Sequence, residues 1–347
     1  MHDRIMRGAF VALAFVACQT APNVAPDASP SSAPLVHLFE DGVLYAQSLD
    51  GHVFSGEHLD HHEPILDRAR SISGAGGPLD LFPPPTGSEC AALSTGEVVC
   101  TGSNVDGNLG SIATDVCGDE GCTSSMLDAA TNCAGLLSYC CYPCVTAWTV
   151  LPDAVNLLQV HRNCGIDYAG NVVCWGRSNP TFPLPVRKLA GDFAILANGD
   201  LVRIATKHLV LTNVRDASTD ALTRSSCAVT TDTSLYCWGE NLFGEVGDGT
   251  TTPRTDPVLV GTGYRVVRVF FGLACAIRTD DTVACWGGVN LDSDAPPTLT
   301  PTSVAGLVQV REVALIDTRF DALLRDGSVV QVAPPFDAPR IETIHPR

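Results

Sequence analysis

A repeated cysteine spacing constrains this chain more than any other feature. Eight of its fifteen cysteines form four pairs, and nine residues separate the members of each pair. The pairs are Cys90/Cys100, Cys164/Cys174, Cys227/Cys237 and Cys275/Cys285. Segments that begin at Tyr45, Phe193 and Asp321 fit the same frame without cysteines, which makes seven similar units. We therefore expect seven copies of one local structure.

The spacing predicts an antiparallel hairpin in each unit. If the two cysteines are directly opposite, three residues on each side pair and three remain as the loop. The third loop residue then adopts a left-handed conformation, which suits Gly best and Asn or Asp next. Five units have Gly there, the sixth unit has Asp281, and Thr233 in the fifth is the one poor fit. The glycines are Gly51, Gly96, Gly170, Gly199 and Gly327.

Direct opposition also favours disulfides. Opposed residues of an antiparallel pair have Cα atoms about 4.5 or 5.5 Å apart, depending on their place in the ladder. Both separations lie within the range of about 4.4–6.8 Å that a disulfide spans. We therefore predict a disulfide within each of the four C-x9-C hairpins.

Three tryptophans follow the second cysteine of a unit, and each precedes a glycine. They are Trp175, Trp238 and Trp286. Neighbouring strand residues point to opposite faces, so the cysteine and the tryptophan need cover on both sides of the hairpin. Stacked propeller blades provide such cover. Packing is therefore the expected role of the tryptophans, in preference to a shelf for a ligand.

Irregular distances between the units favour blades with loop insertions over a regular solenoid. The prediction is a seven-bladed all-β propeller over residues 35–347. The strand-like segments 35–39 and 340–344 are expected to complete one blade together and so close the ring. Deletion of residues 340–347 is then expected to destabilise the whole domain.

The units resemble the regulator-of-chromosome-condensation repeat, also called the alpha-tubulin-suppressor-like repeat. The fifth unit, residues 227–260, keeps that family's glycine-rich run after Trp-Gly, with Gly244, Gly247 and Gly249. The second unit keeps the sequence SNVDGNLG at residues 103–110. The resemblance implies a seven-bladed propeller that acts as a protein-binding scaffold. It does not carry over the nucleotide exchange and chromatin binding of the family's eukaryotic founder.

The first residues are typical of an export signal. Arg4 and Arg7 precede a short apolar run that is too short to span a bilayer, so residues 1–17 are predicted to be a signal peptide. The sequence FVAC, which ends at Cys18, resembles a bacterial lipobox, and Cys18 is predicted to be lipidated. Removing Cys18 from the fifteen cysteines leaves fourteen, an even number that suits complete pairing. The paired cysteines and this signal resemble the family's bacterial secreted lipoprotein branch.

The alternative to lipidation is ordinary cleavage near Ala17 or Ala21. Residues 18–34 are rich in Pro, Ala and Ser and are predicted to be a disordered tether. The predicted location is the bacterial outer membrane or cell surface, or otherwise the periplasm or the medium, with the lipid as the only contact with the membrane.

Residues 111–155 depart from the repeat as a Cys-rich insertion. The six remaining cysteines lie within it, and the sequence does not determine their pairing: Cys117, Cys122, Cys133, Cys140, Cys141 and Cys144. Tyr139, Tyr142 and Trp148 are the candidate recognition patch. The alternative is that the insertion is a protective cover.

A formal net charge of −17 argues against nucleic acid and anionic membrane surfaces as partners. His58, His61 and His62 are weak candidates for metal ligands, but a solvated polar loop explains them better, so no metal site is predicted. No cofactor or hydrolase motif is present. The expected function is therefore a monomeric, non-enzymatic binding scaffold for a protein or a glycan. The alternatives are an enzyme with a site in the propeller funnel and a purely structural lipoprotein.

Overall fold

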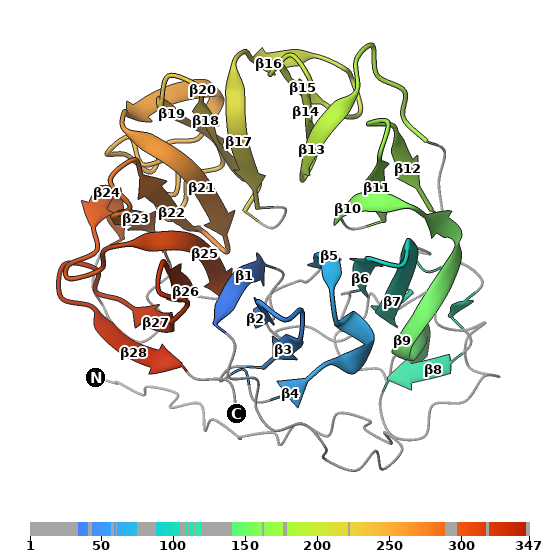
Figure 1. The fold of residues 1–347 in the computed structure, drawn as a ribbon. Coiled ribbons are helices and arrows are strands. Elements are labelled where there is room, and N and C mark those ends of the chain that lie inside the picture. Colours follow the sequence, from blue (N-terminus) through green and yellow to red (C-terminus); the bar gives the residue numbers. More distant parts are fainter. Residues whose placement is uncertain are drawn as a thin grey trace, which may run out of the picture.

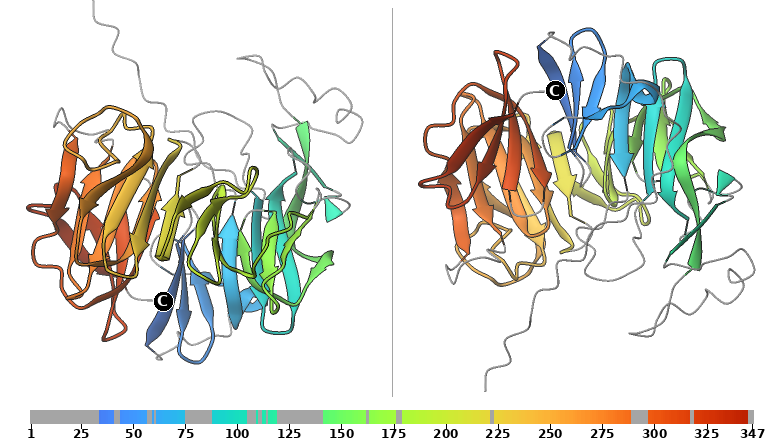
Figure 2. Two further views of the ribbon diagram at one scale, coloured as in Figure 1. Left: turned by 90° about the horizontal axis from the view of Figure 1, so that it is seen from above. Right: turned by 90° about the horizontal axis from the view of Figure 1, so that it is seen from below.

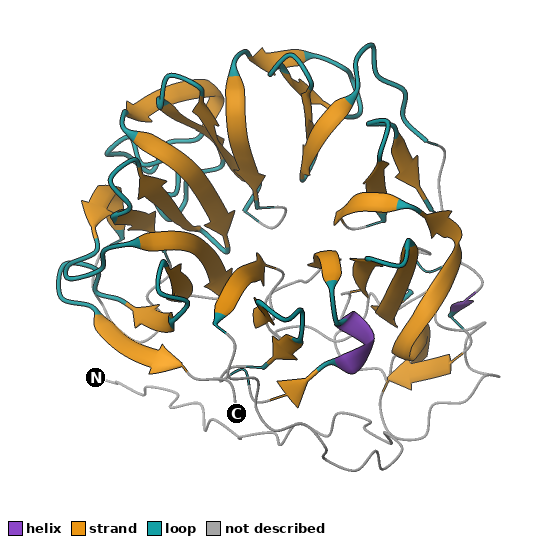
Figure 3. Ribbon diagram, in the orientation of Figure 1, coloured by secondary structure: helices purple, strands orange, loops and turns teal. Residues whose placement is uncertain are grey.

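The computed structural model describes residues 34–40, 44–56, 59, 61–74, 88–104, 109, 112–113, 115–118, 141–161, 163–175, 179–220, 223–288, 297–316 and 319–344. Their secondary structure is almost entirely β, apart from short turns of helix such as η1 (Pro64–Leu66) (Figure 3). Seven antiparallel sheets surround a central axis (Figure 1), and Figure 2 shows them from above and below. This arrangement confirms the predicted seven-bladed propeller.

The blades are numbered here along the chain. Blade 1 contains β1 (Leu35–Glu40), β2 (Leu44–Ser48), β3 (Val53–Ser55) and β4 (His61–His62). Blade 2 contains β5 (Ala69–Gly74), β6 (Ser88–Leu93), β7 (Glu97–Ser103), β8 (Asp115–Gly118) and β9 (Cys141–Val155). Blade 3 contains β10 (Leu157–His161), β11 (Cys164–Asp167) and β12 (Val172–Cys174), and blade 4 contains β13 (Val186–Ala190), β14 (Phe193–Leu196), β15 (Leu201–Arg203) and β16 (Leu209–Leu211).

The remaining three blades follow the same order. Blade 5 contains β17 (Val214–Thr219), β18 (Ser225–Thr230), β19 (Leu235–Gly239) and β20 (Arg254–Gly261). Blade 6 contains β21 (Tyr264–Phe270), β22 (Leu273–Arg278), β23 (Val283–Gly287) and β24 (Thr298–Ser303). Blade 7 contains β25 (Val310–Ile316), β26 (Arg319–Leu324), β27 (Val329–Ala333) and β28 (Arg340–Ile344).

The predicted hairpins are the second and third strands of the blades. In each of the four C-x9-C units the two cysteines are directly opposite and form the predicted disulfide. The bridges are Cys90–Cys100, Cys164–Cys174, Cys227–Cys237 and Cys275–Cys285. Cys285 also pairs with Thr302 of β24 on its other side, so the bridge of blade 6 lies inside the sheet, where both of its cysteines are fully buried.

The Cα atoms of the bridged cysteines are closer together than predicted. They are 4.1 Å apart in the Cys275–Cys285 bridge and 4.0 to 4.1 Å apart in the other three, just below the expected separation of about 4.5 Å. The physical reason is the place in the ladder, because a pair without mutual backbone hydrogen bonds brings its side chains closest. In the fifth unit the Thr230–Ser234 pair beside the loop is hydrogen-bonded. Hydrogen-bonded and non-hydrogen-bonded pairs alternate along the ladder, so Cys227–Cys237, three pairs further on, is a non-hydrogen-bonded pair.

The third residue of every hairpin loop has a positive φ. The angle is between 82° and 98° at the five glycines, 62° at Asp281 and 71° at Thr233. Thr233 therefore takes the left-handed conformation despite its branched Cβ. Its N–H donates to the carbonyl of Thr230 (3.0 Å), and its own carbonyl accepts from Tyr264 of the next blade (3.0 Å). These contacts on both sides hold an unfavourable residue in place.

The three tryptophans pack between blades, as predicted. Trp286 is fully buried in the same cluster as the Cys227–Cys237 disulfide of the preceding blade. Trp175 packs in the same way with the Cys90–Cys100 bridge. Blade 4 has no disulfide, and there Trp238 meets Phe193 edge to face, with ring centroids 5.6 Å apart.

The prediction for closure of the ring is wrong. Strand β28 pairs with β27, and β1 pairs with β2, so each terminal strand completes its own blade. Both strands find a full partner nearby in the chain, and neither needs the other terminus. Side chains close the ring instead: Leu35 and Leu38 share a buried cluster with Ile316 and Ile344.

The predicted insertion of residues 111–155 ends in a blade strand. Strand β9 covers its last fifteen residues and pairs with β7, with Thr149 opposite Cys100. Strand β8 pairs with the first part of β9. Because Ser103 is opposite Cys144, the chain leaves and re-enters blade 2 on the face opposite the hairpin loops. Residues 119–140 lie outside the described residues.

Candidate functional site

A cavity of about 600 Å³ follows the propeller axis. All seven innermost strands contribute to its lining, from β1 of blade 1 to β25 of blade 7. Figure 1 looks along this axis. Every blade contributes to this lining, and such a position suits a binding site.

Every innermost strand has a β-bulge at its second residue. The register shifts there in all seven pairings of the first strand with the second. Five of the seven bulged residues are arginines, and the other two are Val36 and Leu158. The arginines are Arg70, Arg187, Arg215, Arg265 and Arg311. A bulge leaves one residue outside the ladder and redirects its side chain.

The arginines lie at the same end of the channel as the hairpin loops, because the strand begins beside the loop. Tyr264, for example, is opposite Arg278 at the edge of its loop. Arg187 donates to the carbonyls of Val214 (2.8 Å) and Arg215 (3.2 Å) on the next blade. Carbonyls are neutral acceptors, so these bonds orient Arg187 without cancelling its charge.

Arg265 repeats that contact on blade 7, where it donates to the carbonyls of Val310 (2.7 Å) and Arg311 (3.1 Å). It also forms an ion pair with Asp281 (3.1 Å). Burial lowers the pKa of Arg265, against the opposing charge of Asp281, and neighbouring arginines lower it further. The lowered pKa of Arg265 therefore reflects its burial first, and the nearby Arg325 and Arg215 second.

The third residue of the innermost strand connects neighbouring blades. Asp216 accepts a hydrogen bond from the Val267 N–H (3.1 Å) and forms ion pairs with Lys188 and Arg268. Burial acts to raise the pKa of Asp216, but the charges of Lys188 and Arg268 outweigh it and lower that pKa to about 2. Asp216 is therefore an anion held by two cations, which suits a structural role better than acid–base catalysis.

Glu312 is the one carboxylate among the described residues that line the channel, and it is also engaged. Its Oε2 lies 2.7 Å from His37 Nδ1 and accepts from the Leu38 N–H (2.8 Å). Burial acts to raise the pKa of Glu312, but the hydrogen bond and charge of His37 prevail and lower it. The lining also includes Arg70, Lys188, Arg265, Arg268 and Arg311. The channel is therefore basic inside a protein whose net charge is −17.

A second cavity of about 480 Å³ opens between blades 4 and 5. Its lining mixes both signs of charge, because it includes three carboxylates and three arginines: Asp192, Asp220, Glu240, Arg203, Arg224 and Arg254. Asp220 already accepts hydrogen bonds from Thr223 Oγ1 (2.7 Å) and from a backbone N–H of the next blade. This balance of charge gives the second cavity no preference for a cation or an anion.

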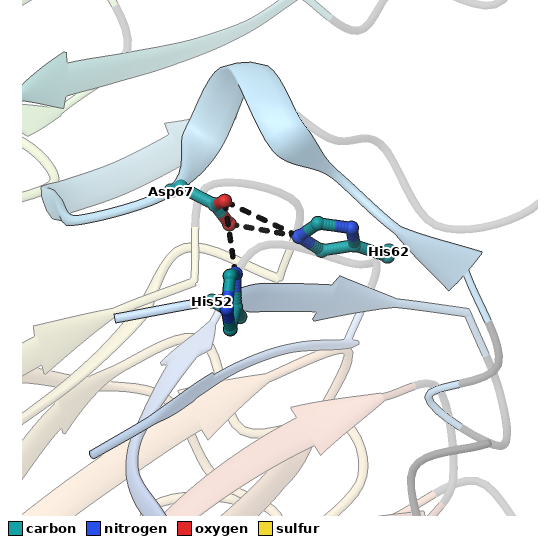
Figure 4. Close-up of side chains that lie close together, drawn as sticks. All are labelled: His52, His62 and Asp67. Atoms are coloured by element: carbon teal, nitrogen blue, oxygen red, sulfur yellow. Dashed lines mark hydrogen bonds and ion pairs between the residues drawn. The ribbon is translucent and has the colours of Figure 1, made fainter. Parts of the chain in front are cut away.

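The weak metal candidates do not come together as a set. His61 and His62 are neighbours on β4 and point to opposite faces, and His58 lies outside the described residues. His62 instead meets Asp67 and His52 at the outer edge of blade 1 (Figure 4). Sequence reasoning missed His52 and Asp67, because only the hairpin and the η1 turn bring them to His62.

The candidate recognition patch is described in part. Trp148 is half-buried on β9 and packs against the cluster that contains Leu66 and Ile72. Tyr139 and the side chain of Tyr142 lie outside the described residues. Cys144 is buried and disulfide-bonded. The pairing of the insertion cysteines and the state of Cys18 lie outside the described residues as well.

The fold and the channel define a class: a disulfide-bridged, seven-bladed β-propeller with a basic central channel. No family model matches the sequence. The chain is similar to the solved structure of Prp20p from Saccharomyces cerevisiae, with 16% identity over 90% of this chain and 77% of that chain and a TM-score of 0.42. That protein is described together with its binding to Gsp1p and histones.

Two further similarities span most of the chain. Human WBSCR16 has 14% identity over 86% of this chain and 69% of that chain, with a TM-score of 0.40. Hsv2 of Kluyvelomyces marxianus has 9% identity over 90% of this chain and 98% of that chain, with a TM-score of 0.43. At these identities the similarities concern the fold alone.

The disulfides fit an exported protein, because such bridges persist in oxidising compartments. Over the part of the chain that the structure describes, no helix has the length and apolar character needed to cross a membrane.

Proposed function

We propose that this protein is a non-enzymatic, exported binding scaffold that takes an acidic segment of a protein partner at the arginine end of its channel. The observation that carries the proposal is the set of arginines at the second position of five innermost strands. Arg70, Arg187, Arg215 and Arg311 are exposed. A set of cations at a shaped mouth attracts an anionic ligand and orients it.

The net negative charge of the chain opposes the local attraction of the arginines, and this opposition favours one specific acidic partner over acidic proteins in general. The whole chain is acidic, so it repels most acidic proteins at a distance. Attraction begins only within about a Debye length of the channel mouth, roughly 8 Å at physiological ionic strength. A narrow acidic loop or tail fits that condition better than a broad acidic surface. A neutral glycan carries no charge for the arginines to attract, so we favour a protein with an acidic segment as the partner.

Glu312 in the channel lining and Asp216 beside it argue against acid–base catalysis in the channel. Asp216 and Glu312 both hold backbone N–H groups of neighbouring blades and have lowered pKa values. A general acid or base needs a pKa close to the working pH instead. We therefore prefer binding to catalysis, and we propose a monomer attached to the membrane only through a lipid on Cys18.

The test is capture from intact cells with the full-length chain. Arg215→Ser with Arg311→Ser removes two exposed cations from the mouth. The control, Arg340→Ser with Arg203→Ser, removes two exposed cations at the strand ends away from the hairpin loops. We expect crosslinking to recover an acidic partner with the wild type and the control variant, and to recover it at least about ten-fold less with the channel variant. Binding should also weaken steeply as salt rises.

Two results would count against the proposal. Equal recovery with the channel variant would show that the partner binds elsewhere. Recovery of no partner, together with turnover of a small substrate that the channel variant loses, would favour the funnel enzyme. Anchoring is tested separately: Cys18→Ala should move the protein from the membrane fraction to the soluble fraction, and an unchanged distribution would refute lipidation.

A further inference from the structure

Two histidines and an aspartate converge beside β4, the outermost strand of blade 1, and none of the three lines the channel. His52 Nδ1 lies 3.0 Å from Asp67 Oδ2, and His62 Nε2 lies 3.0 Å from Asp67 Oδ1. The two imidazole rings stand edge to face, with centroids 5.0 Å apart. Figure 4 shows both rings directed at the one carboxylate. The three candidate ligand atoms all lie within 4.8 Å of one another.

Ordered elements hold all three side chains. His52 follows the loop of the first hairpin, and its carbonyl accepts the N–H of Ser48 (2.9 Å) to close that loop. His62 is on β4, where it is opposite Phe54 of β3. Asp67 directly follows η1, whose Leu66 is fully buried. The site therefore needs little further ordering to bind a ligand.

The donor atoms suit a zinc-class cation. Two imidazole nitrogens and one carboxylate form a common protein ligand set for Zn²⁺, with a fourth position left for water or a further ligand. Bonds of about 2.0–2.2 Å in a tetrahedron separate the donors by roughly 3.3–3.5 Å. The present separations of 3.0 to 3.3 Å between the imidazole nitrogens and the carboxylate oxygens are close to that value.

Outer groups also match those of metal sites. The Val53 N–H donates to Asp67 Oδ1 (3.0 Å) and fixes the carboxylate. Asp50 Oδ2 lies 3.9 Å from the other nitrogen of His52. A metal-bound histidine commonly has a carboxylate near its second nitrogen, which orients the ring and strengthens the ligand. His52 is 44% exposed and Asp67 28%, so a cation can reach the site from solvent.

We propose that His52 Nδ1, His62 Nε2 and the carboxylate of Asp67 bind one divalent transition-metal ion of the zinc class. Bound metal would tie the first hairpin to β4 and to the η1 turn. The hairpin and β4 belong to blade 1, and η1 lies between this blade and blade 2. Blade 1 has no hairpin disulfide among its described residues. The metal would therefore stabilise a blade that otherwise depends on packing.

The same contacts would also be explained by a simple His–Asp–His clamp that binds nothing. The experiment separates the two explanations by calorimetric titration of the full-length, oxidised protein with Zn²⁺ alone. We expect one ion per chain. His52→Ala, His62→Ala and Asp67→Asn should each weaken binding by more than about 100-fold, and Asp50→Asn by about ten-fold.

His61→Ala is the matched control, because it removes a histidine from the same strand on the opposite face. It should leave the affinity unchanged. Circular dichroism shows whether each alanine variant is folded. If one is not, the affinity of Asp50→Asn for Zn²⁺ and the Co²⁺ spectrum of the wild type test the site instead. Nitrogen and oxygen ligands give tetrahedral Co²⁺ bands without thiolate charge transfer.

Two outcomes would overturn the metal site. One is no Zn²⁺ binding by the wild type, which leaves the clamp as the explanation. The other is binding that survives His52→Ala and His62→Ala or that shows thiolate charge transfer, which places the metal on other residues.

Discussion

Glu312 of the last blade accepts a hydrogen bond from the backbone N–H of Leu38 in the first, at 2.8 Å. Asp216 makes the equivalent contact from blade 5 to Val267 of blade 6, at 3.1 Å. The junction between the two ends of the chain therefore uses the same side-chain-to-backbone bond as an internal junction. Closure by this bond and by buried side chains does not require a strand shared between the termini.

Loss of the Glu312 carboxylate should weaken the closure of the ring. We expect Glu312→Ala to lower the free energy of unfolding by about 2 kcal/mol, because a hydrogen bond to a charged acceptor and the contact with His37 are both lost. Glu312→Gln keeps an acceptor oxygen and should cost less than half as much. Urea denaturation measures both values. Glu342→Ala, on the exposed outer strand, is the control, and an equal cost there would contradict the role of Glu312.

Asp216 should make the propeller sensitive to acid. Its pKa is lowered from 3.8 to about 2, so its contribution to stability is complete above the ordinary pKa and disappears as the pH falls through about 2. The shift corresponds to about 2 kcal/mol at neutral pH. We expect Asp216→Asn to flatten the pH dependence of the unfolding free energy between about pH 4 and pH 2. Asp256→Asn, at an exposed position, should leave the slope intact.

The hairpin disulfides should each stabilise their own blade. The Cys227–Cys237 bridge spans ten residues and is fully buried. Replacing both cysteines by alanine should cost about 3 kcal/mol on the chain-entropy model, plus the loss of packing against Trp286. Denaturant melts of the oxidised variant and wild type give the difference. A cost close to zero would mean that packing alone orders the hairpin.

The glycine-rich run after β19 should tolerate no side chain at Gly247. A Cβ there would lie 2.5 Å from Trp286 Nε1, the atom that donates to the Glu245 carbonyl (2.9 Å). We expect Gly247→Ala to lower the unfolding free energy by at least about 2 kcal/mol through strain and overpacking. Gly306→Ala separates the two causes, because Gly306 also has a positive φ but has nothing within 4 Å of the added Cβ. Gly306→Ala should therefore cost less.

The sequence by itself determined the hairpins. The paired cysteines are ten positions apart in the sequence, and Gly96 or Gly170 stands at the third loop position. Only one strand register then allows both the turn and the disulfide to form. The contacts involved span few residues, so local rules suffice. Strand geometry places Cys227 and Trp238 on opposite faces of the hairpin. Both faces must therefore be covered by neighbouring blades. Seven blades follow from seven such units.

Tertiary structure alone decided which distant residues meet. The termini close the ring through Glu312 and Leu38 because packing between blades, which no local pattern encodes, already brings β25 beside β1. Strand β9 joins blade 2 across a long excursion, since its partner is set by the open edge of β7. His52 and Asp67 reach His62 through one hairpin and one turn, so three ordinary surface residues become a candidate metal site. None of these contacts can be predicted from the positions of the residues in the sequence, because each contact depends on how complete blades pack and pair.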